Sequence, residues 1–351
     1  MLIRIEGKNR THELEAHEGE TVLVAALGAG LSVPYECGTG TCGTCRARLV
    51  EGAVEDRWPD APGRRHLKAA DEHLLCQCIP QSDCSFMADS WIYRADAAAI
   101  RVGVYSGRLR APALVARDTA TFQIDLDRTF PFEAGQFVTV EVPGLPGARA
   151  YSMSNYGPGP SGRAIELLIK RKPQGGFSEW LFGHPELRDG APVIVTGPFG
   201  KATFSPNQMT NVVCIAGGSG LAGVLSILAR ATDEGYFRQF QGHVFFGVRA
   251  NADAFLLNRL AKAVDTYDGR LKVTVALSDE PPTDSLRDNY PTLSFVQGMV
   301  HDAARDGLAD IDLQRTIAYV AGPPPLVSAA QRLLLLERKM SAGSIRYDKF
   351  M

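Results

Sequence analysis

The sequence lacks any apolar run near the roughly 18 residues that a membrane-spanning helix needs, and its first ten residues lack the basic start and apolar core of a signal peptide. It also has no excess of basic residues, because 37 Lys and Arg stand against 39 Asp and Glu, for a net charge of −2. This balance argues against a nucleic-acid partner. We therefore expect a cytoplasmic protein that binds neither membrane nor nucleic acid.

The 351 residues are too many for one ordinary core and predict two or three domains. Residues 1–94 show an alternating hairpin pattern followed by a helix that Thr21 can cap. Residues 100–207 contain short alternating strands, which are typical of an antiparallel β-barrel. Residues 208–351 contain apolar runs that end in glycine or proline, which predict a parallel sheet with crossover helices. The expected fold is multidomain, α+β and α/β.

Four of the seven cysteines follow the spacing of a plant-type [2Fe–2S] cluster. Cys37, Cys42 and Cys45 form C-x4-C-x2-C, and a further thiol follows about thirty residues later. Glycines between them allow backbone N–H groups to turn toward the cluster sulfurs. A zinc site is the alternative, but zinc ligands usually come as C-x2-C pairs at both ends. Cys76 and Cys78 are both candidates for the fourth cluster ligand. We predict Cys76, because the two leucines directly before it should pack in the core and fix its position.

Two further motifs lie in the middle of the chain. The first, at residues 149–155, reads R-x-Y-S-x-x-N and follows a predicted strand, and the second, Gly175-Gly176-Phe177-Ser178, precedes a helical stretch. Glycines at a helix N-terminus favour anion binding through backbone N–H groups and the helix dipole.

With these motifs, residues 1–92 resemble a plant-type ferredoxin domain, and the rest is similar to the ferredoxin–NADP reductase superfamily in its oxygenase-reductase branch. The resemblance implies FAD, with FMN as the alternative; reductases of the phthalate type, which use FMN, carry their ferredoxin domain at the C-terminus. By resemblance, Arg149 pairs with the flavin pyrophosphate, Tyr151 packs on the isoalloxazine, and Ser152 acts catalytically by hydrogen bonding near N5. The implied flavin-binding residues are Arg149, Ala150, Tyr151, Ser152, Ser154, Gly175, Gly176 and Ser178.

A nicotinamide site is predicted from two glycine-containing turns. A predicted strand runs into Gly217-Gly218-Ser219-Gly220 and then a helix, an arrangement that presents backbone N–H groups to a phosphate. This turn resembles the family pattern G-G-x-G-x-A-P, with Gly223 in place of proline. A second strand runs into Gly322 and Pro323, similar to the family's C-G-P-P with Ala321 in place of cysteine. Residues 247–251 lack the Ser and Tyr of NADPH-using relatives, which favours NADH, although Arg249 could bind a 2′-phosphate.

The last residues also resemble the family. Its members end in an aromatic residue that covers the flavin until nicotinamide displaces it, with an acidic residue two positions earlier. Phe350 and Asp348 occupy these positions, and the resemblance implies catalytic roles for both.

Together these features predict electron flow from NADH to FAD to [2Fe–2S] to an external acceptor, because nicotinamide releases a hydride whereas the cluster takes single electrons. The resemblance implies the reductase component of a multicomponent bacterial oxygenase, a monomer that contacts its oxygenase or ferredoxin partner transiently. The segment Trp58–Gly63 is similar to toluene-4-monooxygenase-type reductases, which favours a diiron hydroxylase of aromatic hydrocarbon oxidation. Alternatives are a Rieske dioxygenase or P450 system, an iron–sulfur flavoreductase of deoxysugar synthesis, and a non-enzymatic NADH sensor.

Overall fold

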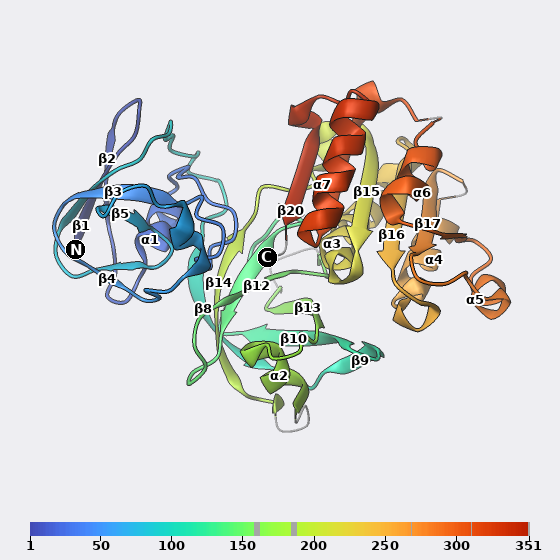
Figure 1. Cartoon of the computed structure of the whole chain (residues 1–351), viewed down its shortest axis with the longest axis horizontal. Helices are drawn as coiled ribbons and strands as arrows, with labels where there is room; N and C mark the ends of the chain where they lie inside the picture. Colours follow the sequence, from blue (N-terminus) through green and yellow to red (C-terminus); the bar gives the residue numbers. More distant parts are fainter. Residues whose placement is uncertain (158–161, 184–187, 268, 310, 350–351) are drawn as a thin grey trace. The chain divides into compact units, whose positions relative to one another are not determined.

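The computed structural model describes residues 1–157, 162–183, 188–267, 269–309 and 311–349 (Figure 1). The chain divides into two compact units. The first unit contains residues 1–106, 138–150 and 193–199, and the second contains residues 107–137, 151–192 and 200–351. Within the described ranges, every helix is too short or too polar to cross a bilayer.

Residues 1–92 fold around a sheet with strand order β2-β1-β7-β3-β5. The antiparallel pairing of β1 with β2 and the parallel pairing of β1 with β7 place the first strand in the interior of the sheet, and β7 is its central strand. As predicted, a helix follows the hairpin, and the Thr21 side chain accepts a hydrogen bond from Val24 N at 3.4 Å. The elements are β1 (Leu2–Glu6), β2 (Thr11–Glu15), α1 (Val22–Gly28), β3 (Arg46–Glu51), β4 (Val54–Asp56), η1 (Pro62–His66), β5 (Glu72–Leu74), β6 (Cys78–Pro80) and β7 (Cys84–Met87).

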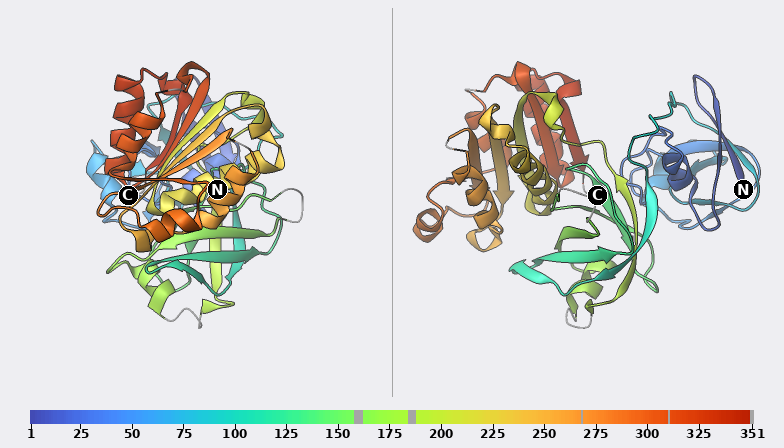
Figure 2. Two further views of the ribbon diagram at one scale, coloured as in Figure 1. Left: turned by 90° about the vertical axis from the view of Figure 1, so that its right-hand side faces the viewer. Right: turned by 180° about the vertical axis from the view of Figure 1, so that it is seen from behind.

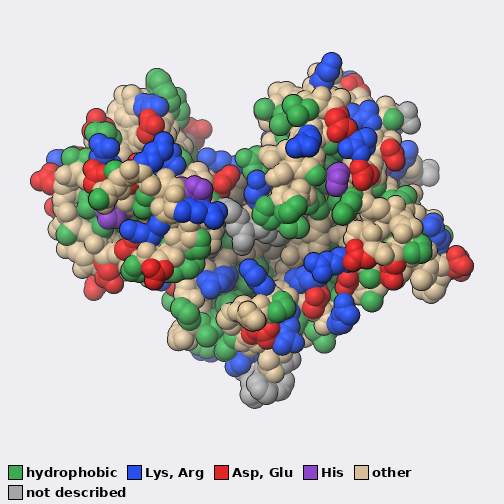
Figure 3. Space-filling model, in the orientation of Figure 1, with side chains coloured by type: hydrophobic (Ala, Val, Ile, Leu, Met, Phe, Trp, Pro, Cys, Tyr) green, Lys and Arg blue, Asp and Glu red, His purple; other side chains and the backbone are tan. Residues whose placement is uncertain are grey.

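Residues 1–92 carry 14 acidic and 9 basic side chains. Figure 3 shows acidic and basic side chains interspersed on the visible face of this part rather than gathered by sign. Several of them pair locally, such as Arg4 with Glu13 at 2.8 Å and Lys8 with Asp89 at 2.7 Å. The excess of acidic residues therefore does not form one acidic patch on that face.

The second sheet has strand order β12-β11-β14-β8-β10-β13, with β9 paired to β10, and contributes strands to both units. Its β10 pairs antiparallel with β13, β8 and β9, as expected for the barrel. The elements are β8 (Gly103–Leu109), β9 (Ala113–Ala116), β10 (Thr119–Leu126), β11 (Phe137–Glu141), β12 (Arg149–Ser152), β13 (Ala164–Lys170), α2 (Gly176–Gly183) and β14 (Pro192–Phe199).

The third sheet has strand order β18-β17-β16-β15-β19-β20, and its neighbouring strands are parallel. Alternate side chains of β15 enter two separate cores: Val212 and Cys214 join the core with α3 and α4, whereas Val213 and Ile215 join the core with α6 and α7. Figure 2 shows helices on both faces of this sheet. The elements are β15 (Asn211–Gly217), α3 (Leu221–Asp233), β16 (Gly242–Val248), α4 (Leu257–Asp265), β17 (Leu271–Leu277), α5 (Asp284–Asn289), β18 (Ser294–Gln297), α6 (Val300–Gly307), β19 (Thr316–Gly322), α7 (Pro324–Arg332) and β20 (Ile345–Lys349).

The predicted strands of this last sheet are confirmed where both faces are buried. The apolar runs at residues 212–216, 243–246, 271–276 and 316–320 all lie in strands. The edge strands β18 and β20 were not predicted. Their residues are mostly half-buried or exposed, so the apolar run that marks a central strand is missing from them.

Candidate functional site

The four predicted cluster ligands come together as two pairs of thiols. Cys45 Sγ lies 3.3 Å from Cys76 Sγ, and the Cys37 and Cys42 side chains form a hydrogen bond with each other. Among the described residues, no three His, Cys, Asp or Glu side chains converge as a single-ion site would require. Pairs fit a [2Fe–2S] cluster better than a zinc ion, because the four cysteines of such a cluster are shared between two irons.

Backbone N–H groups point at these sulfurs, as the sequence pattern predicts. The N–H of Thr39 donates to Cys37 Sγ and the N–H of Thr44 donates to Cys42 Sγ, each at 3.4 Å. The hydrogen bond from Cys42, reinforced by those from the neighbouring threonines, lowers the pKa of the Cys37 thiol to about 4 despite its burial. The loop thus stabilises the thiolate of Cys37, the form of cysteine that binds iron, whereas the same hydrogen bond raises the pKa of the Cys42 thiol.

The structure separates the two candidates for the fourth ligand. Cys76 contacts the Cys45 thiol, and the side-chain amide of Gln77 donates to Cys76 Sγ at 3.5 Å. Cys78 begins β6 and is fully buried, and burial raises the pKa of its thiol. This arrangement supports Cys76, and the assignment stays a prediction.

The loop that carries Cys37, Cys42 and Cys45, here called the cluster loop, lies against the barrel strands β11 and β14 within the first unit. Gly38 has a positive φ of 67°, and a Cβ at this position would stand 3.7 Å from the Thr139 side chain and 3.8 Å from the Phe199 ring. The ring of Tyr35 meets Phe199 edge-on, with centroids 5.7 Å apart. A cavity of about 470 Å³ lies beside this contact, and Cys76 and Arg149 both line it. A predicted cluster ligand and the predicted flavin arginine therefore share one cavity.

The two predicted flavin motifs also meet, within the second unit. The rings of Tyr151 on β12 and Phe177 on α2 lie 5.5 Å apart between centroids, at 34°. Helix α2 begins at Gly176, and a Cβ built there would meet nothing within 4 Å. The start of α2 therefore has the open space that an anion needs. Ser152 follows Tyr151 on β12 and is buried.

Two predicted flavin-binding serines have other partners in the structure. Ser154 Oγ donates to Glu166 Oε1 at 2.6 Å, and Arg259 Nη1 donates to the same oxygen at 2.7 Å. Ser178 Oγ accepts from Lys172 N at 3.0 Å and so closes the turn before α2. These hydroxyls hold the local fold, and their contacts with the cofactor stay predictions, as do those of the exposed Ala150.

The two halves of the predicted nicotinamide site lie side by side. A Cβ at Gly220 would stand 2.3 Å from the carbonyl oxygen of Ala321, so only glycine allows this approach of the two turns. Gly322 likewise lies against Gly217, with a Cβ position 3.3 Å from its nitrogen. Gly220 and Gly322 are buried and shape the site, whereas Gly217, Gly218, Ser219 and Pro323 line its cavity.

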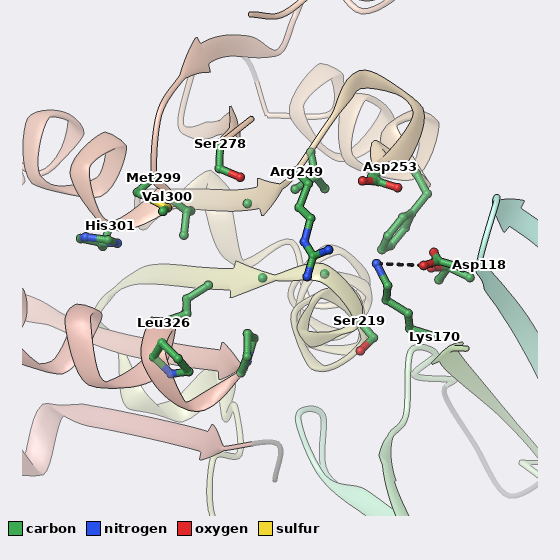
Figure 4. Close-up of a pocket in the computed structure, with 18 of the residues that line it drawn as sticks. Asp118, Lys170, Ser219, Arg249, Asp253, Ser278, Met299, Val300, His301 and Leu326 are labelled. Carbon is green, nitrogen blue, oxygen red and sulfur yellow. Dashed lines mark hydrogen bonds and ion pairs between the residues drawn. The ribbon is translucent and has the colours of Figure 1, made fainter. Parts of the chain in front are cut away.

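This cavity, of about 490 Å³, opens at the carboxyl ends of β15, β16, β17 and β18, where nucleotides bind in open parallel sheets (Figure 4). Arg249 points into it from the end of β16. Lys170 enters from the barrel strand β13 and forms an ion pair with Asp118 at 3.2 Å. The sequence motifs missed these barrel residues, because only the fold brings the ends of β13 and β10 to the nucleotide sheet.

The predicted C-terminal residues are only partly placed. Asp348 lies on β20, opposite Ala321 of β19 in the strand register, and is half-buried. This register puts Asp348 next to the turn of the predicted nicotinamide site. Phe350 lies outside the described residues, and its role stays a prediction.

Comparison with known proteins matches each part of the chain to a family of domains. The 2Fe-2S iron-sulfur cluster binding domain matches residues 3–81, the oxidoreductase FAD-binding domain residues 106–204, and the oxidoreductase NAD-binding domain residues 214–332. The ferredoxin–NAD(P)+ reductase CarAd of Metapseudomonas resinovorans is 34% identical over 338 residues, which cover 95% of each chain. The chain belongs to the reductase components of multicomponent oxygenases.

Other relatives of this reductase serve different oxygenases. The ferredoxin–NAD+ reductase component of the alkene monooxygenase system of Xanthobacter autotrophicus is 31% identical, covering 98% of this chain and 99% of its own. Among solved structures, the ferredoxin reductase in carbazole 1,9a-dioxygenase has a TM-score of 0.80 at 31% identity, covering 100% of this chain and 99% of its own. The Amycolatopsis cytochrome P450 reductase GcoB has a TM-score of 0.79 at 28% identity, covering 99% of this chain and 98% of its own. The family carries a [2Fe–2S] cluster, FAD and a nicotinamide nucleotide, as predicted.

Proposed function

We propose that this reductase takes a hydride from NADH and delivers single electrons through its cluster to a separate oxygenase or ferredoxin component. The observation that supports this most directly is the cavity lined by both Cys76, a predicted cluster ligand, and Arg149, the predicted flavin arginine. Bound flavin accepts a hydride and releases electrons one at a time. We also propose domain boundaries at residues 1–94, 100–207 and 208–351, and a monomer that meets its partner transiently.

The residues of this chain bind and orient rather than break bonds. Arg149 would hold a phosphate of the flavin, because this arginine lines the cavity beside the cluster loop. Lys170 and Arg249 bring positive charge into the nucleotide cavity, where a pyrophosphate or ribose phosphate would lie. Ser152 is buried, and its hydroxyl would donate a hydrogen bond to the flavin ring.

We propose a diiron hydroxylase or its ferredoxin as the acceptor, in the oxidation of an aromatic or other hydrocarbon. The relatives' names include a xylene/toluene monooxygenase, a phenol 2-monooxygenase and a naphthalene dioxygenase system, so Rieske and P450 acceptors remain alternatives. The segment Trp58–Gly63 also has a structural role, since Trp58 packs on the core of this part and Ala61 is buried.

Purified protein tests the proposal and the ligand assignment together. We expect about one FAD and two irons per chain, and NADH-dependent reduction of both ferricyanide and cytochrome c. Cys76→Ser should abolish cytochrome c reduction through the cluster while ferricyanide reduction by the flavin survives. Cys78→Ser is the matched control and should retain both activities and the iron. Loss of iron in Cys78→Ser but not in Cys76→Ser would reverse the assignment, and zinc in place of iron would refute the proposed function.

A further inference from the structure

An ion pair ties the segment beside the cluster to a flavin-barrel strand in the first unit. Arg57 follows β4, and Glu141 is the last residue of β11. The guanidinium donates to both carboxylate oxygens, from Nη2 at 2.8 Å and from Nη1 at 3.3 Å. Two-point pairing of this kind fixes orientation as well as distance.

The Arg57 end of this pair is connected to the cluster ligands through the backbone. The N–H of Arg57 donates to the carbonyl of Gln77 at 2.9 Å, and Gln77 directly follows Cys76. The same Gln77 donates its side-chain amide to Cys76 Sγ at 3.5 Å. A shift of Arg57 therefore moves the residue that supports a predicted ligand.

The Glu141 end is connected to the flavin side. On the same strand, Thr139 lies under the cluster loop, with its methyl group 3.7 Å from the Cβ position of Gly38. Arg57, Glu141 and Thr139 line the cavity that also contains Cys76 and Arg149. The ion pair therefore lies on the wall of the cavity that a predicted cluster ligand and the predicted flavin arginine share.

We propose that Arg57 and Glu141 are positioning residues that hold the cluster loop against the flavin barrel for electron transfer, an inference that rests on the proposed function. Electron transfer between two cofactors slows steeply as their separation grows, so a contact that fixes this separation controls the rate. The side chains are 37% and 23% exposed, so salt should weaken the pair. The Tyr35–Phe199 contact is a second connection between this part and the barrel, so we expect the effect of breaking the pair to be partial.

The experiment follows flavin oxidation and cluster reduction by stopped-flow absorbance after one addition of NADH to the full-length protein. The variants are Arg57→Gln, Glu141→Gln and the exchange Arg57→Glu with Glu141→Arg. We expect cluster reduction to slow about threefold or more in each single variant, and the exchange to recover most of the loss. Raising the salt concentration should slow the wild type and leave the glutamine variants nearly unchanged. Hydrogen exchange at residues 137–141 should rise in the single variants, with or without bound cofactors.

Arg4→Gln is the matched control, because it breaks an exposed ion pair with Glu13 inside the β1–β2 hairpin. It should leave cluster reduction unchanged, and all variants should reduce ferricyanide at the wild-type rate. Unchanged cluster reduction in both single variants, or an exchange variant as slow as the single ones, would overturn the inference. Failure of the proposed function would be visible separately, as wild-type protein without flavin or cluster absorbance.

Discussion

His243 provides a quantitative test of how burial controls stability in the nucleotide sheet. It lies on β16, is 8% exposed, and stacks on Phe245 with ring centroids 3.9 Å apart. Its Nε2 lies 2.9 Å from Thr274 Oγ1. Burial, and secondarily the positive charge of Lys272, lowers the pKa of His243 from 6.5 to about 4. The folded protein therefore favours the neutral imidazole down to a lower pH than the unfolded chain does.

The direction of the pH dependence follows from proton binding. Between pH 6.5 and pH 4 the unfolded chain binds a proton at His243 that the folded chain does not, so the free energy of unfolding falls as the pH is lowered. At 1.36 kcal/mol per pKa unit, the free energy of unfolding falls by about 2 kcal/mol at pH 5 and by about 3 kcal/mol at pH 4. Above pH 7 the contribution of this group is constant.

His243→Gln removes the titrating group and keeps a side chain that can bond to Thr274. Urea unfolding followed by circular dichroism at pH 8, 7, 6 and 5 gives the free energy for the wild type and the variant. We expect the variant to gain about 2 kcal/mol relative to the wild type between pH 8 and pH 5. The exposed His17→Gln is the control and should follow the wild type. A constant difference between His243→Gln and the wild type at all four pH values would refute the reasoning.

Two further predictions concern the nucleotide site. Gly223→Ala should raise the free energy of unfolding by about 0.5–1 kcal/mol, because its Cβ would make only ordinary 3.9 Å contacts with Gly135 and Ser152. Gly220→Ala should instead lower the melting temperature and weaken NADH binding, because its Cβ would clash with Ala321. Equal effects of the two substitutions on stability would contradict this prediction. The wild-type protein should prefer NADH. Arg249→Ala should lower kcat/KM for NADPH about tenfold and change kcat/KM for NADH little. An unchanged ratio of the two kcat/KM values would show that Arg249 does not contact a 2′-phosphate.

The sequence alone was sufficient wherever neighbouring residues carry the signal. The spacing of Cys37, Cys42 and Cys45 is a local property of one loop. The structure pairs Cys37 with Cys42 and Cys45 with Cys76, and their binding of one cluster stays a prediction. Continuous apolar runs also mark strands buried on both faces, so the central strands of the nucleotide sheet were predictable. The edge strands β18 and β20 were not, because exposure on one side removes that pattern.

Only the tertiary structure decided which distant residues meet. Tyr151 and Phe177 stand in separate motifs, and the packing of α2 on the barrel makes them neighbours. Lys170 is an ordinary charged strand end in the sequence, and it enters the nucleotide cavity because the barrel and the parallel sheet pack within one unit. Arg57 and Glu141 carry no motif and are 84 residues apart. Such pairs depend on how elements pack across the whole chain, and the spacing of residues within any one segment does not contain that information.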